Sequence, residues 1–402
     1  MDSKKTYDPP LKGVRIIELG QIIAGTYGGQ LLTDLGAEVV KVESPKGDLG
    51  RLDSIAPFKG HSGLFLTFNR NKKSVVIDLK KEAGLKIFYE LVKKSDVVVD
   101  NFRPGVLEKL KVDYKSLKKI NKRIIQCSIT GFGATGKYKD LPALDIIIQS
   151  ISGMLAITGQ PGGPPSRVGI PISDLSGGVF SSSGILAALY DRERTGEGRR
   201  IELSMFDSML SLLSYMGTMW LTNRELPTPQ GTKHEYTVPW QAFKTSDNYV
   251  VIAARQDIFW EKLCDVIVSE ELRSDARFKT NQKRVDNKEI LIPLLEAIFE
   301  KQTTEFWLER LREAGVPASP VNNLDGVFSE PPVNERDMIT SYNHPEVGEV
   351  RLPGNPIKFE GVRKIESTPA PLLGQHTDQI LRSWLNFDQI EIDELRDKDV
   401  VA

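Results

Sequence analysis

Cysteine and histidine are scarce in this sequence, and their scarcity excludes several kinds of site. The 402 residues include only two cysteines, Cys127 and Cys264, and four histidines that are scattered along the chain. Two cysteines without a partner cluster predict neither a disulfide framework nor a structural zinc site. Scattered histidines also argue against a histidine-based metal centre. We therefore expect no bound metal.

An excess of either charge is also missing, as are apolar runs long enough to cross a bilayer. The formal net charge at pH 7 is −1, whereas a protein that neutralises many phosphates needs a basic excess on at least one face. The first residues, MDSKKTYDPPLKG, are charged and contain proline, unlike a signal peptide. We expect a cytoplasmic globular protein that binds neither nucleic acid nor membrane.

The sequence does contain an alternation of short β-branched runs and amphipathic segments. It begins with VRIIEL at 14–19, a glycine-rich turn and helix at 25–36, and a second strand at 37–43. Strands separated by helices of this length favour an α/β fold, with a parallel sheet and helices on both faces. The further elements predicted are strands at 73–79, 96–102 and 123–133 and helices at 81–95 and near 104–110.

The composition and the hydrophobic pattern of the sequence change after about residue 225. RELPTPQGTKHEYTVP is a proline-rich polar connection, and AFKTSDNYVVIAA begins a different, α+β pattern. A second irregular stretch lies around 328–356, so two connections imply two domains. The expected boundaries are a large domain at 1–200, a linker at 201–230, a small α+β domain at 231–327, a second linker at 328–365 and a return to the large domain at 366–402.

Gly25, Gly28 and Gly29 follow the first predicted strand, and Glu43 ends the second. This arrangement invites a dinucleotide interpretation, with Glu43 as the acid that binds a ribose. The spacing is G-x-x-G-G rather than G-x-G-x-x-G, however, so the signal for a nicotinamide site is weak. The glycines still permit close approach of the backbone to another ligand.

Asp174 is the most distinctive acidic residue of the chain. It follows a strand-like segment at 168–172 and precedes the small residues LSGG, at the position of a helix N-cap. A cap is the simpler interpretation. The alternative is a nucleophile that the helix dipole keeps ionised, with small neighbours that admit a bulky ligand.

Six blocks of the sequence are informative when they are taken together and in order. The blocks are LKGVRIIELGQIIAGTYGGQLLTDLGAEVVKVESPKGDLGR (11–51), FNRNKKSVVIDLK (68–80), DVVVDNFRPGVLEKL (96–110), IIQCSITGFGATG (124–136), RTGEGRRIELSMFDS (194–208) and PAPLLGQHTD (369–378). Together they resemble the class III coenzyme A transferases, the family of formyl-CoA transferase and carnitine-CoA transferase. The resemblance runs from about residue 11 to the C-terminus, and six blocks are far more specific than any one of them.

The resemblance implies a fold and an assembly. The family forms two interlocked ring-shaped subunits, each with a Rossmann-like large domain built from both chain ends and a smaller domain inserted by two linkers. A homodimer is expected, and a heteromer with a paralogue is an alternative because some members work as unlike pairs.

The resemblance also implies a mechanism in which Asp174 is the catalytic nucleophile. The family's aspartate attacks a donor thioester, forms an acyl-aspartyl anhydride, and then carries CoA as an aspartyl thioester until an acceptor acid collects it. The expected partners are an acyl-CoA, with succinyl-CoA as a reasonable donor, and a small carboxylic acid. Coenzyme A thioester is then a substrate, and no cofactor is bound permanently.

By their positions in the family's pattern, nine residues are implied to bind CoA. Asn101 and Phe102 are the most convincing, because NFRPG is itself part of the motif. A cluster of cations around NRNKKSVVIDLK, namely Arg70, Lys72 and Lys73 besides Lys80, also suggests a place for phosphates. The nine implied residues are Ile22, Ile23, Ile77, Lys80, Asn101, Phe102, Arg103, Lys109 and Met205.

Two other functions remain open at this point. In the related 2-methylacyl-CoA racemases a histidine precedes an aspartate, whereas here the pair is Leu144 and Asp145, so one of the two acid/base groups that racemisation needs is missing. A non-catalytic CoA-binding subunit of a heteromer is the other alternative. Asp145 is either a second functional carboxylate or a buried hydrogen-bonding group.

The sequence does not identify the acids. Arg51 and Arg255 could bind a dicarboxylate, and His234 lies in a mixed polar and aromatic segment, KHEYTVPW, that could shape the acid pocket.

Overall fold

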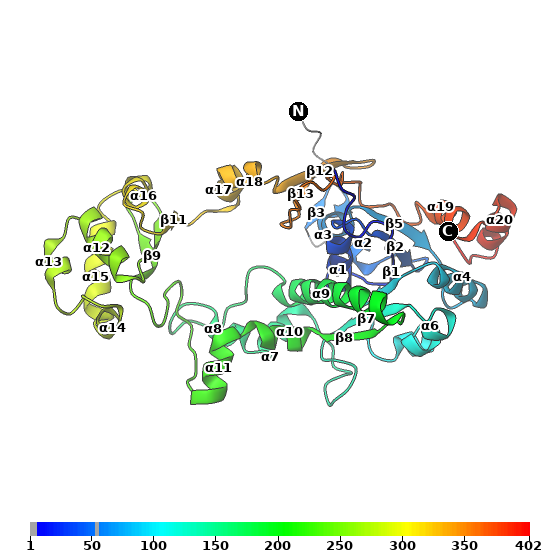
Figure 1. Ribbon diagram of the computed structural model, residues 1–402, viewed down its shortest axis with the longest axis horizontal. Helices are drawn as coiled ribbons and strands as arrows, with labels where there is room; N and C mark the ends of the chain where they lie inside the picture. Colours follow the sequence, from blue (N-terminus) through cyan, green and yellow to red (C-terminus); the bar gives the residue numbers. More distant parts are fainter. Residues whose placement is uncertain (1–5, 53–55) are drawn as a thin grey trace. The chain divides into compact units, whose positions relative to one another are not determined.

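A computed structural model describes residues 6–52 and 56–402 and divides the chain into two compact units, whose elements are labelled in Figure 1. Unit 1 comprises the chain up to Met154, Val168–Glu225 and Asn334–Ala402. Unit 2 comprises Leu155–Arg167 and Leu226–Val333. Unit 1 is therefore assembled from three separate segments, the last of which is the C-terminal part of the chain.

Unit 1 contains a six-stranded sheet in which every neighbouring pair of strands is parallel. The strands are β1 (Arg15–Glu18), β2 (Glu38–Glu43), β5 (Lys72–Val76), β6 (Val97–Asp100), β7 (Ile125–Thr130) and β8 (Arg200–Ser204). Their order is β5-β2-β1-β6-β7-β8, which is the 3-2-1-4-5-6 order of doubly wound dinucleotide-binding folds. The predicted α/β class with a parallel sheet is confirmed.

One face of this sheet is covered by α1 (Ala24–Thr33) and α9 (Ile172–Thr195), which lie side by side in Figure 1. Alternate residues of the strands face these helices, as Ile16 does in β1 while Ile17 faces the opposite side. Burial on both faces explains why the strands read as nearly continuous apolar runs.

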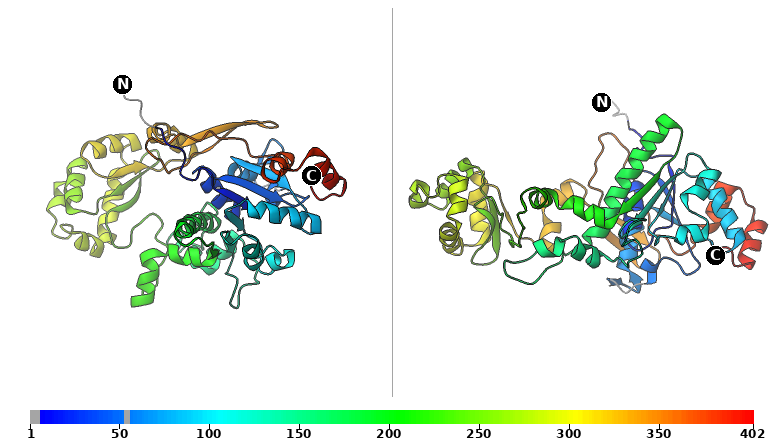
Figure 2. Two further views of the ribbon diagram at one scale, coloured as in Figure 1. Left: turned by 45° about the vertical axis from the view of Figure 1, so that its right-hand side comes forward. Right: turned by 90° about the horizontal axis from the view of Figure 1, so that it is seen from below.

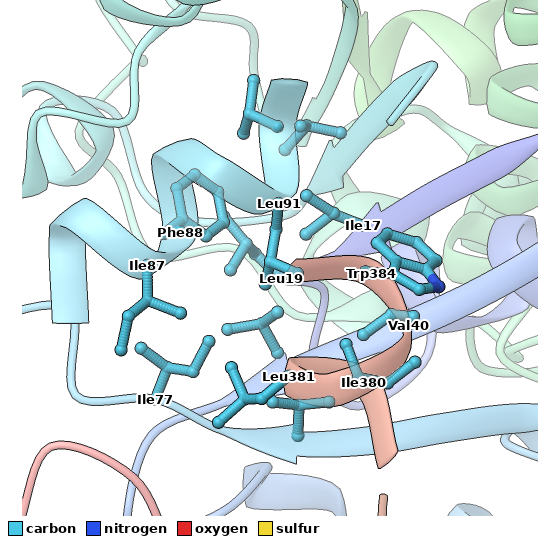
Figure 3. Packing of buried hydrophobic residues seen from close by; sticks show 14 of the residues in the cluster. Ile17, Leu19, Val40, Ile77, Ile87, Phe88, Leu91, Ile380, Leu381 and Trp384 are labelled. Carbon is cyan, nitrogen blue, oxygen red and sulfur yellow. The ribbon is translucent and has the colours of Figure 1, made fainter. Parts of the chain in front are cut away.

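The other face is covered by α4 (Glu82–Lys93), α6 (Tyr114–Ile120) and the C-terminal helix α19 (Thr377–Leu385). Figure 3 shows Ile380, Leu381 and Trp384 of α19 packed with Phe88 of α4 and Ile17 of β1. Both views of Figure 2 place the C-terminal helices, in red, beside the blue and cyan elements of unit 1. The sheet begins at Arg15, and the chain returns at Thr377, more than 350 residues later, to complete its core.

Smaller elements complete unit 1. The hairpin β12–β13 is joined to the segment around Leu66 by the Tyr342 hydroxyl, which donates to the carbonyl of Leu66 at 2.8 Å. The elements are α2 (Leu49–Leu52), β3 (Pro57–Phe58), β4 (His61–Ser62), α3 (Gly63–Phe68), α5 (Val106–Leu110), α7 (Asp145–Ile151), α10 (Met205–Leu212), α11 (Ser214–Asn223), β12 (Ile339–His344), β13 (Gly348–Pro353) and α20 (Gln389–Asp397), with α8 (Met154–Ile157) and α18 (Pro331–Glu335) at the unit boundaries.

Unit 2 is an α+β unit with its own core. Its three-stranded antiparallel sheet has the order β11-β10-β9, and aromatic side chains such as Phe243, Trp260 and Phe299 fill the space between sheet and helices. The elements are β9 (Trp240–Lys244), β10 (Tyr249–Ala253), α12 (Asp257–Val266), α13 (Glu270–Ser274), α14 (Asn281–Asp286), α15 (Lys288–Phe299), α16 (Thr304–Glu313), β11 (Ala318–Pro320) and α17 (Leu324–Ser329).

The structure differs from two sequence-based expectations. Residues 168–171 form no strand, and α9 begins at Ile172 with Pro171 as its N-cap. Asp174 is therefore the third residue of the helix and not its cap. The segments 201–230 and 328–365, expected to be linkers, contain β8, α10, α11 and the β12–β13 hairpin, and most of each belongs to unit 1.

Among the described residues, α9 is the one helix long and apolar enough, by length and composition, to cross a membrane. Its most apolar window has a mean hydropathy of 1.2, and half of that window is buried inside the protein. Because α9 packs against α1, α10 and β7, its apolar residues are those of a core helix.

Candidate active site

The sheet order places a crevice between β1 and β6. From β1 the chain first adds β2 and β5 on one side of the sheet and then adds β6, β7 and β8 on the other. Ligands of doubly wound folds bind at this switch point, beyond the carboxyl ends of the strands. The loop after β1 is Gly20–Ile23, and the loop after β6 begins with Asn101 and Phe102. Both loops carry residues that the resemblance implied.

A cavity of about 390 Å³ lies at this point. Its walls come from the carboxyl ends of four strands and from the first turn of α9, which contributes Asp174. Its lining residues are Gln21, Ile22, Ile23, Ala24, Leu49, Asn101, Phe102, Arg103, Pro104, Ile129, Thr130, Gly131, Lys139, Asp140, Leu141, Ala143, Leu144, Asp145, Asp174 and Met205.

A second cavity of about 180 Å³ shares Gln21 and Phe102 with the first. It contains Ile77, Asp78 and Lys80, which follow β5, together with residues of the β1 and β2 ends. The two adjoining cavities form an elongated site, with Asp174 in the larger one. An elongated ligand can therefore lie across the ends of the strands.

Asp174 is half-buried in the first turn of α9, with no side-chain cap at that helix end. Its burial, and after that the nearby carboxylate of Asp145, raise the pKa of Asp174 to about 7. A carboxylate with a raised pKa is more basic and more nucleophilic than an ordinary one, yet it is still substantially ionised at neutral pH. The dipole of α9 favours that ionised form.

Asp145, at the start of α7, is a hydrogen-bonding residue of this helix junction. One of its oxygens accepts from the Ser173 amide at 2.9 Å and from the Ser173 hydroxyl at 2.7 Å, and the other accepts from Gln149 at 2.7 Å. Gln149 in turn accepts from the Val168 amide at 3.0 Å. These contacts, rather than strand pairing, hold the segment before Asp174.

The small residues that follow Asp174 serve helix packing. A Cβ atom added at Gly178 would lie 2.8 Å from the Tyr27 ring and 3.1 Å from the Gly28 amide. A Cβ at Gly28 would lie 2.3 Å from the Ser181 hydroxyl. Gly28 and Gly178 thus permit a close crossing of α1 and α9, whereas a Cβ added at Gly177 would meet Ile129 and Met205, which line the larger cavity.

The structure brings most of the implied CoA-binding residues together. Ile22, Ile23, Asn101, Phe102, Arg103 and Met205 line the larger cavity, whereas Ile77, Lys80 and Phe102 line the smaller one. Lys109 is exposed on α5 and lines neither cavity. The Asn101 amide group donates to the Gln21 carbonyl at 2.9 Å and accepts from the Gln21 amide at 2.8 Å, so it shapes the loop after β1.

The suggested phosphate cluster is largely a set of structural ion pairs. Lys72 is buried against Glu18 at 2.9 Å, and the other two pairs are Arg70 with Asp34 and Lys73 with Glu38. Arg51 likewise binds Glu43 through two nitrogens at 2.7 Å. Of that cluster, only Lys80 lines one of the two cavities at the switch point.

Sequence reasoning missed Lys139, Asp140 and Thr130 in the wall of the larger cavity. Lys139 and Asp140 form an exposed ion pair at 3.1 Å in a loop without a regular pattern, and the position of Thr130 at the end of β7 was the only available signal. Within the described part of the chain, no group of three or more His, Cys, Asp or Glu side chains is arranged to hold a metal ion.

Comparison with known proteins identifies the family. Residues 11–377 match CoA-transferase family III. The chain is 38% identical to human succinyl-CoA:glutarate CoA-transferase over 98% of its length and 90% of the relative's. It is 40% identical to acetyl-CoA:oxalate CoA-transferase of Acetobacter aceti over 91% of its length and 93% of the relative's.

The solved structures agree. A crystal structure of a CaiB/BaiF family protein from Brucella suis superposes with a TM-score of 0.84 at 35% identity, over 94% of this chain and 100% of that one. The chain belongs to CoA-transferase family III. Its activity is that of an acyl-CoA:carboxylate CoA-transferase.

Proposed function

We propose that Asp174 is the nucleophile that carries the transferred groups. The observation that supports it is the position of Asp174: a half-buried carboxylate on the first turn of α9, lining the larger cavity at the switch point of the sheet. A carboxylate oxygen attacks the carbonyl carbon of the donor thioester, the carbon–sulfur bond breaks, and CoA leaves as its thiolate. The product is a mixed anhydride, which preserves the activation of the acyl group.

The remaining steps exchange the acid. The CoA thiolate attacks the Asp174 carbonyl of the anhydride and releases the donor acid as its carboxylate, which leaves an aspartyl-CoA thioester. The acceptor carboxylate attacks that thioester, regenerates an anhydride and frees the thiolate. A final attack of the thiolate on the acceptor's acyl carbon yields the new acyl-CoA and restores Asp174, so no external energy source is needed.

CoA is proposed to lie across both cavities. Lys80 in the smaller cavity and Arg103 in the larger one offer cations for its phosphates, and apolar walls from Ile77, Phe102 and Met205 suit its less polar parts. Lys109 keeps a proposed role as an exposed cation on α5, outside both cavities.

The substrates are proposed to be a succinyl-CoA donor and a small dicarboxylic acceptor. Relatives are named succinyl-CoA:glutarate, acetyl-CoA:oxalate and succinyl-CoA:mesaconate CoA-transferases. Lys139 in the wall of the larger cavity supplies positive charge for a second carboxylate. Arg51 is bound to Glu43, so the earlier pairing of Arg51 with the substrate is not part of this proposal.

The assembly is proposed to be the interlocked homodimer of the family, in the cytoplasm. Helix α11 buries none of its residues within the chain, and it exposes Tyr215, Trp220 and Leu221. Such an apolar face is unfavourable in water and suits an interface with a second copy. A heteromer with a paralogue would instead give activity only after mixing with the partner.

The test is mass spectrometry of the protein mixed with acyl-CoAs, including succinyl-CoA, and quenched with hydroxylamine or borohydride. A donor-dependent modification at Asp174, absent from Asp174→Asn, is expected. Asp191→Asn is the matched control, because Asp191 lies near the other end of α9 and pairs with Arg199. If CoA binds but Asp174 stays unmodified, the covalent mechanism is refuted, and exchange of the α-hydrogen in deuterium oxide would then indicate a racemase.

A further inference from the structure

A cluster of buried charges lies directly beneath the loop after β1. Glu18, Lys41, Asp48 and Lys72 each expose 2% or less of their surface. Lys41 lies 3.2 Å from Glu18 and 2.7 Å from Asp48, and Lys72 lies 2.9 Å from Glu18. Two lysines and two carboxylates thus form one connected chain of ion pairs inside unit 1.

The loop above this cluster has a strained backbone. Ile22 has a φ of 62°, in the left-handed region that β-branched residues rarely adopt. Such a conformation persists only where the surrounding structure determines it. Ile22 lines the larger cavity together with Asp174, so the strain lies in the wall of the proposed acyl site.

The buried charges contact the loop on both sides of Gln21. The Lys41 ammonium donates to the Gly20 carbonyl at 2.6 Å. The Asp48 carboxylate accepts from the Ile22 amide at 3.0 Å. Both are charge-assisted hydrogen bonds, which are shorter and stronger than neutral ones. With the Asn101 contacts to Gln21, the backbone of three successive loop residues is fixed.

Two simpler explanations account for less of this geometry. Asp48 also accepts from the Gly50 amide at 2.7 Å, as a cap of the short helix α2 would, but a cap does not need to bind an amide 26 residues away in the chain. Ion pairing alone is also insufficient, because buried ion pairs are often no more stabilising than apolar residues of the same volume. The placement of the charges on the loop is the specific feature.

We propose that Asp48 and Lys41 are positioning residues that hold the Gly20–Ile23 loop in the conformation that receives the thioester end of acyl-CoA beside Asp174. This inference rests on the proposed function of Asp174. Asp48 acts through one oxygen on the Ile22 amide, and Lys41 fixes the other oxygen while it binds the Gly20 carbonyl. The strained wall is then preorganised before substrate binds.

The test compares Asp48→Asn with Asp48→Ala. Asparagine keeps an oxygen that can accept from the Ile22 amide but loses the charge beside Lys41, whereas alanine loses both. The control is Asp34→Ala, which breaks the buried pair with Arg70 in the same unit and makes no contact with the loop in the structure. For each variant the melting temperature, and the kcat and KM of CoA transfer from succinyl-CoA, are measured.

If Asp48 is a positioning residue, kcat should depend on a side-chain oxygen that accepts from the Ile22 amide, and the melting temperature should depend on the negative charge beside Lys41. Asp48→Ala should lower kcat by about tenfold or more, because a displaced wall misaligns the reacting groups. Asp48→Asn should keep kcat within about threefold of wild type despite a lower melting temperature, and Asp34→Ala should lose stability without a comparable loss of kcat.

Equal losses of kcat in Asp48→Asn and Asp48→Ala would overturn the inference, and so would the absence of a loss in both. If Asp48→Ala does not fold, Asp48→Asn alone decides, since a tenfold loss in that variant contradicts a role that depends on the oxygen. A failure of wild-type Asp174 to become labelled is a separate result, because it refutes the proposed function and, with it, the premise of this inference.

Discussion

The carboxyl of Asp174 should destabilise the folded protein at neutral and alkaline pH, and Asp174→Asn should therefore stabilise it there. The ordinary pKa of this group is 3.8, and burial with the neighbouring Asp145 carboxylate raises it to about 7 in the folded chain. Between these two values the folded state keeps a proton that the unfolded state has lost. Stability consequently falls as the pH rises through this range and is lowest above pH 7.

The magnitude follows from the difference between the two pKa values. Each pH unit between them corresponds to about 1.4 kcal/mol, so an upper limit is about 4 kcal/mol above pH 7. Asp174 is only half-buried, and solvent screening reduces the expected effect to about 1–2 kcal/mol. Asparagine resembles the protonated carboxyl in shape and does not titrate, so the variant avoids this loss.

The assay is thermal unfolding of wild type and Asp174→Asn at pH 5 and pH 8. For a chain of this length, we expect the melting temperature of the variant to lie about 1–3 °C above wild type at pH 8, with a clearly smaller difference at pH 5. Asp191→Asn, at a partly exposed position on the same helix, should show no such pH-dependent gain. An Asp174→Asn protein that is less stable than wild type at pH 8, or equally stabilised at both pH values, would refute the reasoning.

Three further predictions concern the same unit. The rate of Asp174 labelling by succinyl-CoA should fall as the pH drops below about 7. Asp145→Asn should move that fall to lower pH, because it removes a neighbouring negative charge. If the pH profile of labelling does not move, Asp145 does not contribute to the raised pKa of Asp174. Lys72→Met should lower the free energy of unfolding, measured with urea, by about 3–5 kcal/mol, because it leaves Glu18 buried with one partner fewer. Lys73→Met on the same strand should lower it by about 1 kcal/mol or less. Gly178→Ala should destabilise by about 1–3 kcal/mol, while Gly184→Ala, whose Cβ would meet Ile201 at 3.4 Å, should be neutral or slightly stabilising; equal effects of the two would contradict a tight helix crossing at Gly178.

The regular part of unit 1 could be predicted from the sequence because its strands are buried on both faces. A strand such as β6, Val97–Asp100, reads as a continuous β-branched run whatever it packs against. The predicted strand at 96–102 extended too far, since Asn101 and Phe102 already belong to the loop. Asn101 and Phe102, the two residues wrongly included in the predicted strand, line the larger cavity.

The local structure before Asp174 could not be predicted, because its partners are distant in the sequence. Val168, Ile170 and Ile172 alternate as in a half-buried strand. In the structure the amides of Val168 and Ser173 bind Gln149 and Asp145, so the segment has no strand partner. The sequence pattern of a segment shows which of its side chains are apolar, but it does not show which distant polar side chains will form hydrogen bonds with its backbone.

The same reason explains why the cation cluster was only partly understood. Lys72 and Lys73 are adjacent in the sequence, but they point to opposite sides of β5, and each meets a carboxylate from another strand. Glu18 lies 54 residues before Lys72. Lys80 follows the end of the strand and lines the smaller cavity.

The close crossing of α1 and α9 links the two walls of the proposed acyl site. Helix α1 begins directly after the strained loop that contains Ile22, and α9 begins two residues before Asp174. Because Gly28 and Gly178 lack side chains, the two helices approach closely one or two turns into each of them. The separation between the loop and Asp174 is therefore set by backbone contact rather than by flexible side chains. This suits the proposed reaction, in which Asp174 attacks the donor carbonyl carbon and its own carbonyl carbon is then attacked in the same place by the CoA thiolate and by the acceptor carboxylate.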